Sequence, residues 1–101
     1  MGILDILFGG GKKKEMINDA LKNGSKIIDV RSKAEFQSGN AQGSINIPLD
    51  QISQRAPELK KMKQPLILCC ASGMRSGAAV QQLKQHGIES INGGTWLNFA
   101  K

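Results

Sequence analysis

A short apolar strand that ends in two adjacent cysteines constrains this chain most. The segment from Pro65 to Gly77 reads PLILCCASGMRSG, and Leu66–Leu68 forms an apolar run without polar alternation. Such a run predicts a strand that is buried on both faces, as in a parallel sheet. A helical pattern follows at 76–86, so the thiols lie where a buried strand turns into a helix. Open α/β sheets bind their ligands at such points.

The loop after the cysteines has the composition of an anion-binding site. Unpaired N–H groups at a helix start carry partial positive charge, and a loop between strand and helix can direct several of them inward. Gly73 allows a backbone turn that other residues resist, and Arg75 adds a planar guanidinium suited to an oxyanion. A cysteine inside this ring ionises readily, which predicts a nucleophilic thiolate. The only histidine, His86, follows the helical pattern, so no local Cys–His pair is expected.

The spacing to Arg75 leaves both cysteines open as the nucleophile. Five residues separate Cys69 from Arg75, which is the arrangement of cysteine-dependent phosphatases. Four residues separate Cys70 from Arg75, which makes a tighter loop suited to a thiolate carrying one extra sulfur. The phosphatase count fits less well, because Leu68 stands where those enzymes usually have histidine. Cys69 is otherwise expected to be a core residue of the strand.

Strand and helix patterns alternate along the chain, which predicts a parallel sheet flanked by helices. Ser32 and Glu35 form a capping-box pattern at the start of a short helix. Pro57 is a typical first-turn residue, and Trp96 is expected in the core. The expected strands are 25–30, 44–47, 66–69 and 88–91. The expected helices are 13–23, 32–36, one or two within 49–62, 76–86 and 94–101.

Several motifs together resemble single-domain rhodanese-like sulfurtransferases over about residues 15–99. The loop Cys70–Ser76 is similar to the active loop of that family. One segment departs from the family pattern at two residues, since Asn40 and Ala41 replace the histidine and isoleucine of the family's Gly-His-Ile segment. That histidine is mostly structural in the family. The other matching motifs are Ile27–Arg31, which ends in Asp-Val-Arg, Glu35-Phe36 with 43–49, and Gly93-Gly94 followed by Trp96.

The resemblance implies a three-layer α/β fold with a central parallel sheet of four to five strands flanked by helices. It implies a sulfurtransferase that moves sulfane sulfur from thiosulfate or a persulfide donor to a thiophilic acceptor, through a persulfide on Cys70. The expected partners are a small anionic sulfur donor and a thiol or protein-thiol acceptor, with no cofactor and no metal. Asp29 and Arg31 are expected to support the site, with an ion pair between Arg31 and Glu35. The expected substrate-binding and anion-binding positions are Ala71, Ser72, Gly73, Met74, Arg75 and Ser76.

Two other classes of function stay open. A cysteine-dependent phosphatase or arsenate reductase would use Cys69 as its nucleophile. A non-catalytic sulfur carrier or interaction module would dock on another protein through the apolar N-terminal segment. The hydroxyls of Ser72 and Ser76 could either donate to bound sulfur or cap the helix.

Composition limits the remaining choices. A length of 101 residues predicts one domain, here 13–101, after an apolar and glycine-rich segment at 1–12. Two adjacent cysteines provide neither a disulfide framework nor metal-ligand spacing, and reduced thiols favour a reducing compartment such as the cytoplasm. The protein is expected to be a monomer. The net charge of +6 includes two lysine runs, at 12–14 and 60–63, which supply six of the fourteen basic residues and are expected on the solvated surface. With four aromatic residues and no apolar run of membrane-spanning length, neither nucleic-acid binding nor a transmembrane segment is expected.

Overall fold

A parallel sheet of four strands forms the centre of the part of the chain that the computed structural model describes, residues 11–100. Positions 1–10 of the predicted N-terminal segment, 1–12, therefore lie outside the described residues. The strand order is β2-β1-β3-β4, and every neighbouring pair is parallel. The strands are β1 (Ile27–Asp29), β2 (Ile45–Asn46), β3 (Leu66–Cys70) and β4 (Ser90–Thr95).

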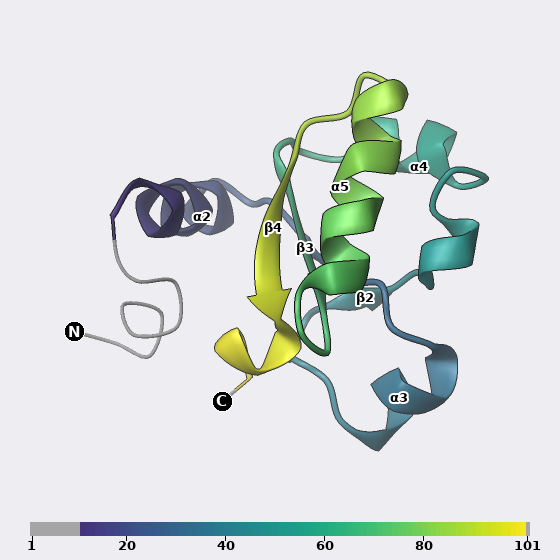
Figure 1. Ribbon diagram of the computed structural model, residues 1–101. Coiled ribbons are helices and arrows are strands. Elements are labelled where there is room, and N and C mark those ends of the chain that lie inside the picture. The colour runs from purple at the N-terminus through teal and green to yellow at the C-terminus, as the bar shows by residue number, and fades with distance from the viewer. Residues whose placement is uncertain (1–10, 101) are drawn as a thin grey trace.

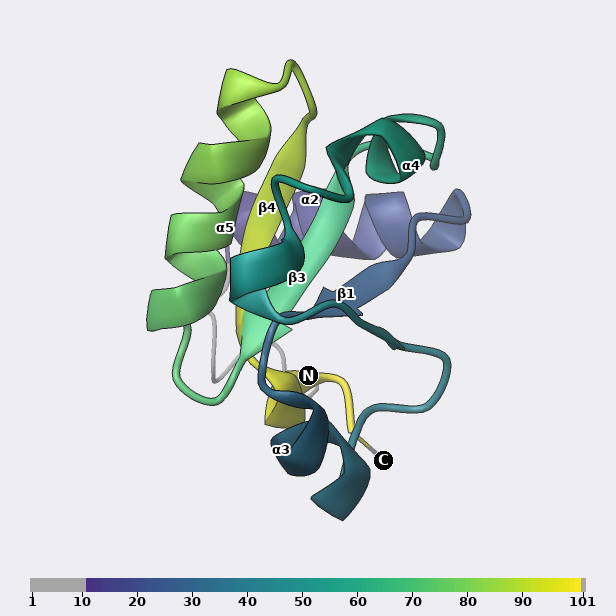
Figure 2. The ribbon, with the colours of Figure 1, turned by 90° about the vertical axis from the view of Figure 1, so that its right-hand side faces the viewer.

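Helices cover both faces of this sheet. The α2 helix lies on one face, and α4 and α5 lie on the other (Figure 1). The view turned by 90° shows α2 behind the strands and α5 in front of β4 (Figure 2). This arrangement confirms the predicted three-layer α/β fold. The α-helices are α2 (Lys12–Lys22), α3 (Lys33–Ser38), α4 (Ala56–Lys60) and α5 (Met74–Gln85), and the 3-10 turns are η1 (Leu49–Gln51) and η2 (Trp96–Asn98). None of the helices in residues 11–100 has the length and apolar character needed to cross a bilayer.

The central strand β3 divides its side chains between two apolar clusters. Leu66, Leu68 and Cys70 belong to the cluster that includes Leu83 of α5. Ile67 belongs to the second cluster, with Ile17 and Ala20 of α2. All five residues of β3 are buried, as the unbroken apolar run predicts. Because neighbouring side chains in a strand point to opposite faces, Cys70 faces the α5 side and Cys69 faces the α2 side.

Local sequence signals determine where two helices begin. The predicted capping box is confirmed, because Ser32 Oγ accepts from the N–H of Glu35 and the Glu35 carboxylate accepts from the N–H of Ser32. The α5 helix begins at Met74, two residues before the predicted start. Its N-cap is Gly73, whose φ of 100° lies in the left-handed region that favours glycine.

The predicted end of the chain was wrong in two respects. The last strand was expected at 88–91, but β4 covers Ser90–Thr95 and includes both Gly93 and Gly94. The expected helix at 94–101 is only the short turn η2. Gly93 suits the strand because the ring of Phe99 packs against it: a Cβ there would lie 2.8 Å from Phe99 Cζ. Gly93 is therefore a site of close packing inside a strand.

Candidate active site

The sulfur of Cys70 lies inside a loop whose backbone N–H groups point toward it. The N–H of Gly73 donates to Cys70 Sγ at 2.9 Å, and the N–H of Ser76 donates at 3.4 Å. The Ser76 hydroxyl lies 3.4 Å from the same sulfur. Both N–H donors come from the start of α5, where intrahelical acceptors are absent and the helix dipole favours negative charge. The loop is therefore built to hold an anionic sulfur.

These contacts make the Cys70 thiol more acidic. Burial by itself would raise the pKa of Cys70, but hydrogen bonds from Ser76 and from the N–H groups of Gly73 and Ser72 lower the pKa below its ordinary value. The residue has 0% exposed surface. In this structure the residue is therefore fully covered by the loop and the side chains packed around it.

The neighbouring Cys69 has the opposite character. It has 0% exposed surface, and burial raises its pKa, with the Asp29 carboxylate adding to the effect. In the sheet its backbone is paired with that of Asp29 of β1. Cys69 is thus a neutral core thiol, as the strand pattern predicts.

The other predicted loop positions differ in what they present to solvent. Ala71 and Ser72 are exposed, and Met74 is 82% exposed at the first position of α5. The Ser72 hydroxyl accepts from the N–H of Met74 at 3.5 Å and so lies at the helix start. Ser76 is buried against the sulfur. The predicted loop therefore exposes Ala71, Ser72 and Met74 at its rim and buries Ser76 against the sulfur.

The guanidinium of Arg75 is engaged by a carboxylate from a distant part of the chain. Arg75 Nη1 and Nη2 donate to the two carboxylate oxygens of Glu35 at 2.7 and 3.0 Å. Both side chains are a little more than one-third exposed. This bidentate pair lowers the pKa of Glu35 to about 2, with help from the N–H of Ser32, and raises the pKa of Arg75. Arg75 also lines a surface hollow with Pro48, Leu49 and Asp50.

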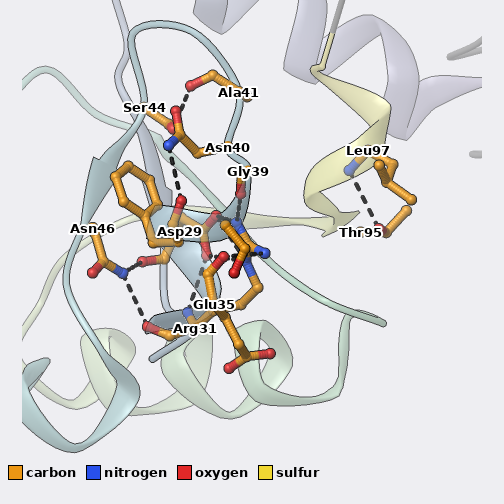
Figure 3. A network of polar contacts seen from close by, with 12 residues as sticks. Asp29, Arg31, Glu35, Gly39, Asn40, Ala41, Ser44, Asn46, Thr95 and Leu97 are labelled. Atoms are coloured by element: carbon orange, nitrogen blue, oxygen red, sulfur yellow. Dashed lines mark hydrogen bonds and ion pairs between the residues drawn. The ribbon is translucent and has the colours of Figure 1, made fainter. Parts of the chain in front are cut away.

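The expected ion pair between Arg31 and Glu35 was wrong, because Arg31 pairs with Asp29 (Figure 3). Arg31 Nη2 donates to Asp29 Oδ2 at 2.8 Å and to the carbonyl oxygen of Gly39 at 2.7 Å. Its Nη1 donates to the backbone carbonyl of Glu35 rather than to the carboxylate. The guanidinium also lies 4.5 Å from the ring centroid of Trp96, a cation–π contact. Trp96 is accordingly half-buried on this ion pair rather than deep in the core.

The two departures from the family pattern have clear structural positions. Asn40 Nδ2 donates to the carbonyl of Phe36 at 2.9 Å, so the side chain closes the end of α3 (Figure 3). Ala41 is buried. Within residues 11–100, neither Asn40 nor Ala41 forms a hydrogen bond with the loop Cys70–Ser76.

One residue beside the site, Asn92 of β4, was missed by the sequence analysis. Its side chain donates to the carbonyl of Gly73 at 2.9 Å and accepts from Ser76 Oγ at 2.7 Å. No local motif marks it, since the two contacts span 19 and 16 residues. The one feature of the sequence that could have pointed to Asn92 as a site residue is its position just before Gly93-Gly94, at the end of an expected strand. Within residues 11–100, no three His, Cys, Asp or Glu side chains gather as a metal site would require.

Together, the parallel sheet and the thiol at the end of its central strand define an α/β protein whose cysteine lies in a loop of converging N–H groups. The chain belongs to the rhodanese-like domain family, whose model matches residues 13–95.

Curated relatives and a solved structure agree with this membership. The chain is 42% identical over 67 residues to the uncharacterized protein YqhL of Bacillus subtilis, covering 66% of this chain and 52% of the relative. It is 34% identical over 65 residues to the putative sulfur carrier protein YrkF of Bacillus subtilis, covering 64% and 35%. A rhodanese with anions from E. coli shares 30% identity and superposes with a TM-score of 0.68 over 76% of this chain and 93% of that one. The chain thus spans about half of the length of YqhL and about a third of the length of YrkF.

Proposed function

We propose that this protein is a sulfurtransferase that carries sulfane sulfur as a persulfide on Cys70. The observation that supports this most strongly is the pair of N–H donors from Gly73 and Ser76 that converge on Cys70 Sγ. These donors stabilise a thiolate before the reaction and a persulfide anion after it. The neighbouring Cys69 thiol receives neither of these N–H donors, and burial raises its pKa, so neither its thiolate nor a persulfide anion on it would be stabilised in this way.

The reaction consists of two half-reactions at one sulfur atom. In the first, the Cys70 thiolate attacks the outer sulfur of thiosulfate, and a new S–S bond forms. The S–S bond of thiosulfate breaks, and sulfite leaves with the electron pair. In the second, cyanide or a thiolate attacks the terminal sulfur of the persulfide. The Cys70–sulfur bond breaks, and the electron pair returns to Cys70 as a thiolate, which predicts ping-pong kinetics.

Arg75 is proposed to orient the oxygens of an anionic donor. In the structure both of its terminal nitrogens are bound to the Glu35 carboxylate. A sulfonate-like group must therefore compete with Glu35, or bind outside the pair. This competition favours donors that carry less charge than thiosulfate, such as a thiol persulfide.

The function is tested by intact-mass measurement after incubation with thiosulfate or glutathione persulfide. We expect the wild type to gain one sulfur atom, which cyanide then removes as thiocyanate. The matched variant Cys69→Ala should gain the same sulfur, and Cys70→Ala should not. Sulfur gain in Cys70→Ala but not in Cys69→Ala would overturn the assignment of the nucleophile.

A sulfur-carrier role is the second candidate. It is supported by the similarity to the putative sulfur carrier protein YrkF and by the exposed Met74 beside the loop. A carrier would show slow turnover with thiosulfate and cyanide but fast exchange of sulfur with a protein persulfide. A phosphatase based on Cys69 has no support among the contacts in residues 11–100, because the loop donors reach Cys70 instead.

A further inference from the structure

The hydroxyl of Ser76 lies between two acceptors, and it has only one proton. Ser76 Oγ is 2.7 Å from Asn92 Oδ1 and 3.4 Å from Cys70 Sγ. A serine hydroxyl donates one hydrogen bond and accepts up to two. Its proton can therefore be given to the amide oxygen or to the sulfur, but not fully to both.

The neighbours of Asn92 settle which way its amide faces. The Nδ2 group donates to the carbonyl of Gly73 at 2.9 Å, and Oδ1 accepts from the N–H of Gly94 at 2.9 Å. A flipped amide would set a donor against the Gly94 N–H and an acceptor against the Gly73 carbonyl. Oδ1 therefore faces Ser76, and because Oδ1 can only accept, Ser76 donates its proton to Asn92.

This assignment determines what Ser76 does for each form of the sulfur. While Cys70 is a neutral thiol, Ser76 Oγ can accept a hydrogen bond from its S–H group. Once the sulfur is negatively charged, the hydroxyl must turn from Asn92 toward Sγ in order to stabilise it. After that turn, Asn92 Oδ1 still accepts from the Gly94 N–H, so the rearrangement leaves no orphaned donor.

We propose that Asn92 is a positioning residue that competes with Cys70 for the Ser76 hydroxyl proton and thereby limits how strongly the loop stabilises a charged sulfur. This inference adds a positioning residue to the proposed sulfur transfer, and its functional importance rests on that proposal. A sulfur that is held slightly less acidic is also a stronger nucleophile once it is ionised. Asn92 thus tunes attack on the donor without touching the substrate.

The charged groups nearest the sulfur loop come from three elements. Arg75 on α5 interacts with Cys70, Asp29 and Arg31 at the end of β1 act on the neighbouring Cys69 thiol, and Glu35 on α3 pairs with Arg75. Within residues 11–100, the Asn92 side chain forms hydrogen bonds with Gly73, Ser76 and Gly94 and with none of these charged groups, so an Asn92 variant leaves their charges in place. A shift in the titration of Cys70 would therefore come through Ser76 or through the loop itself.

The test measures the rate of iodoacetamide alkylation at Cys70 against pH, in a Cys69→Ala background. We expect Asn92→Ala to lower the midpoint by roughly half to one pH unit, which corresponds to the net contribution of one typical hydrogen bond. At pH values well above the midpoint, a one-unit shift should slow alkylation by about threefold, because nucleophilicity falls with the thiol pKa. Asn92→Leu keeps the side-chain volume and should shift the midpoint in the same direction if Asn92→Ala does not fold.

A second background separates proton competition from loosening of the loop. In Ser76→Ala protein, Asn92→Ala should leave the midpoint unchanged, because no hydroxyl proton remains to be shared. A matched control is Asn46→Ala, which removes an amide that donates to the carbonyls of Asp29 and Arg31 but not to the loop. Its midpoint should equal that of the parent protein.

Two results would overturn the proposal. One is a midpoint that rises or stays the same in both Asn92 variants. The other is an equal shift with and without Ser76, which would mean that Asn92 only holds the loop. The alkylation assay uses no sulfur donor, so its outcome is independent of whether Cys70 forms a persulfide. Failure of the proposed function would show instead as no sulfur gain in the mass measurement.

Discussion

Replacing Asp29 with asparagine should destabilise the fold strongly while leaving the sulfur loop chemically competent. The carboxylate has 0% exposed surface and accepts from the backbone N–H of Arg31 and from its Nε and Nη2 atoms. Asp29→Asn removes the negative charge but not the volume. The guanidinium of Arg31, itself 4% exposed, is then left buried without a counter-ion.

The expected size of this effect follows from the cost of an uncompensated buried charge. Removing one partner of a buried ion pair typically costs about 3–5 kcal/mol. Arg31 keeps its hydrogen bonds to the carbonyls of Glu35 and Gly39 and its contact with Trp96, which places the loss near the lower end, about 3 kcal/mol. For a domain of this size, that corresponds to a fall in Tm of about 12–24 °C.

Urea unfolding followed by circular dichroism measures the change in the free energy of unfolding. The matched control Asp19→Asn replaces an exposed aspartate of α2 and should change stability by less than about 0.5 kcal/mol. The double variant Asp29→Asn/Arg31→Met removes both charges and should regain at least half of the loss. A loss below about 1 kcal/mol for Asp29→Asn, or no recovery in the double variant, would refute the reasoning.

Four further predictions concern the site and its surroundings. Glu35→Gln should lower the KM for thiosulfate several-fold by releasing the arginine, whereas Glu58→Gln, which breaks a surface pair with Arg55, should not. Because folding lowers the pKa of Glu35 from 4.5 to about 2, its stabilising contribution is present above pH 4.5 and is lost as the pH falls toward 2, so Glu35→Gln should show a shallower acid limb in urea midpoints. Gly93→Ala should cost about 1–3 kcal/mol in urea unfolding through overlap with Phe99, and a Phe99→Leu background should reduce that cost. Alkylation of Cys70 should have its midpoint below about 8.5, the value of an ordinary thiol; a midpoint above it would contradict the anion loop.

The sequence by itself determined the parts of this protein that depend on local pattern. The apolar run before Cys69 marked a doubly buried strand, because only a strand inside a covered parallel sheet needs no polar alternation. Gly73 marked the turn, since its positive φ is strained for other residues. Ser32 and Glu35 marked a helix start, because a capping box lies within four residues. Short-range geometry of this kind is written into neighbouring residues.

Only the tertiary structure decided how distant residues meet at the loop. The Arg75–Glu35 pair joins positions 40 residues apart, and Asn92 reaches Gly73 across 19 residues. These contacts depend on the order of strands and on the pairing of β3 with β4, whose register shifts by one residue between the pairs Leu68–Asn92 and Cys70–Thr95. A one-residue change of register would reverse every side chain on β4, so that register decides whether Asn92 meets the loop. Charge and hydrogen-bonding capacity are visible in a sequence, but the partner that satisfies them is chosen by packing.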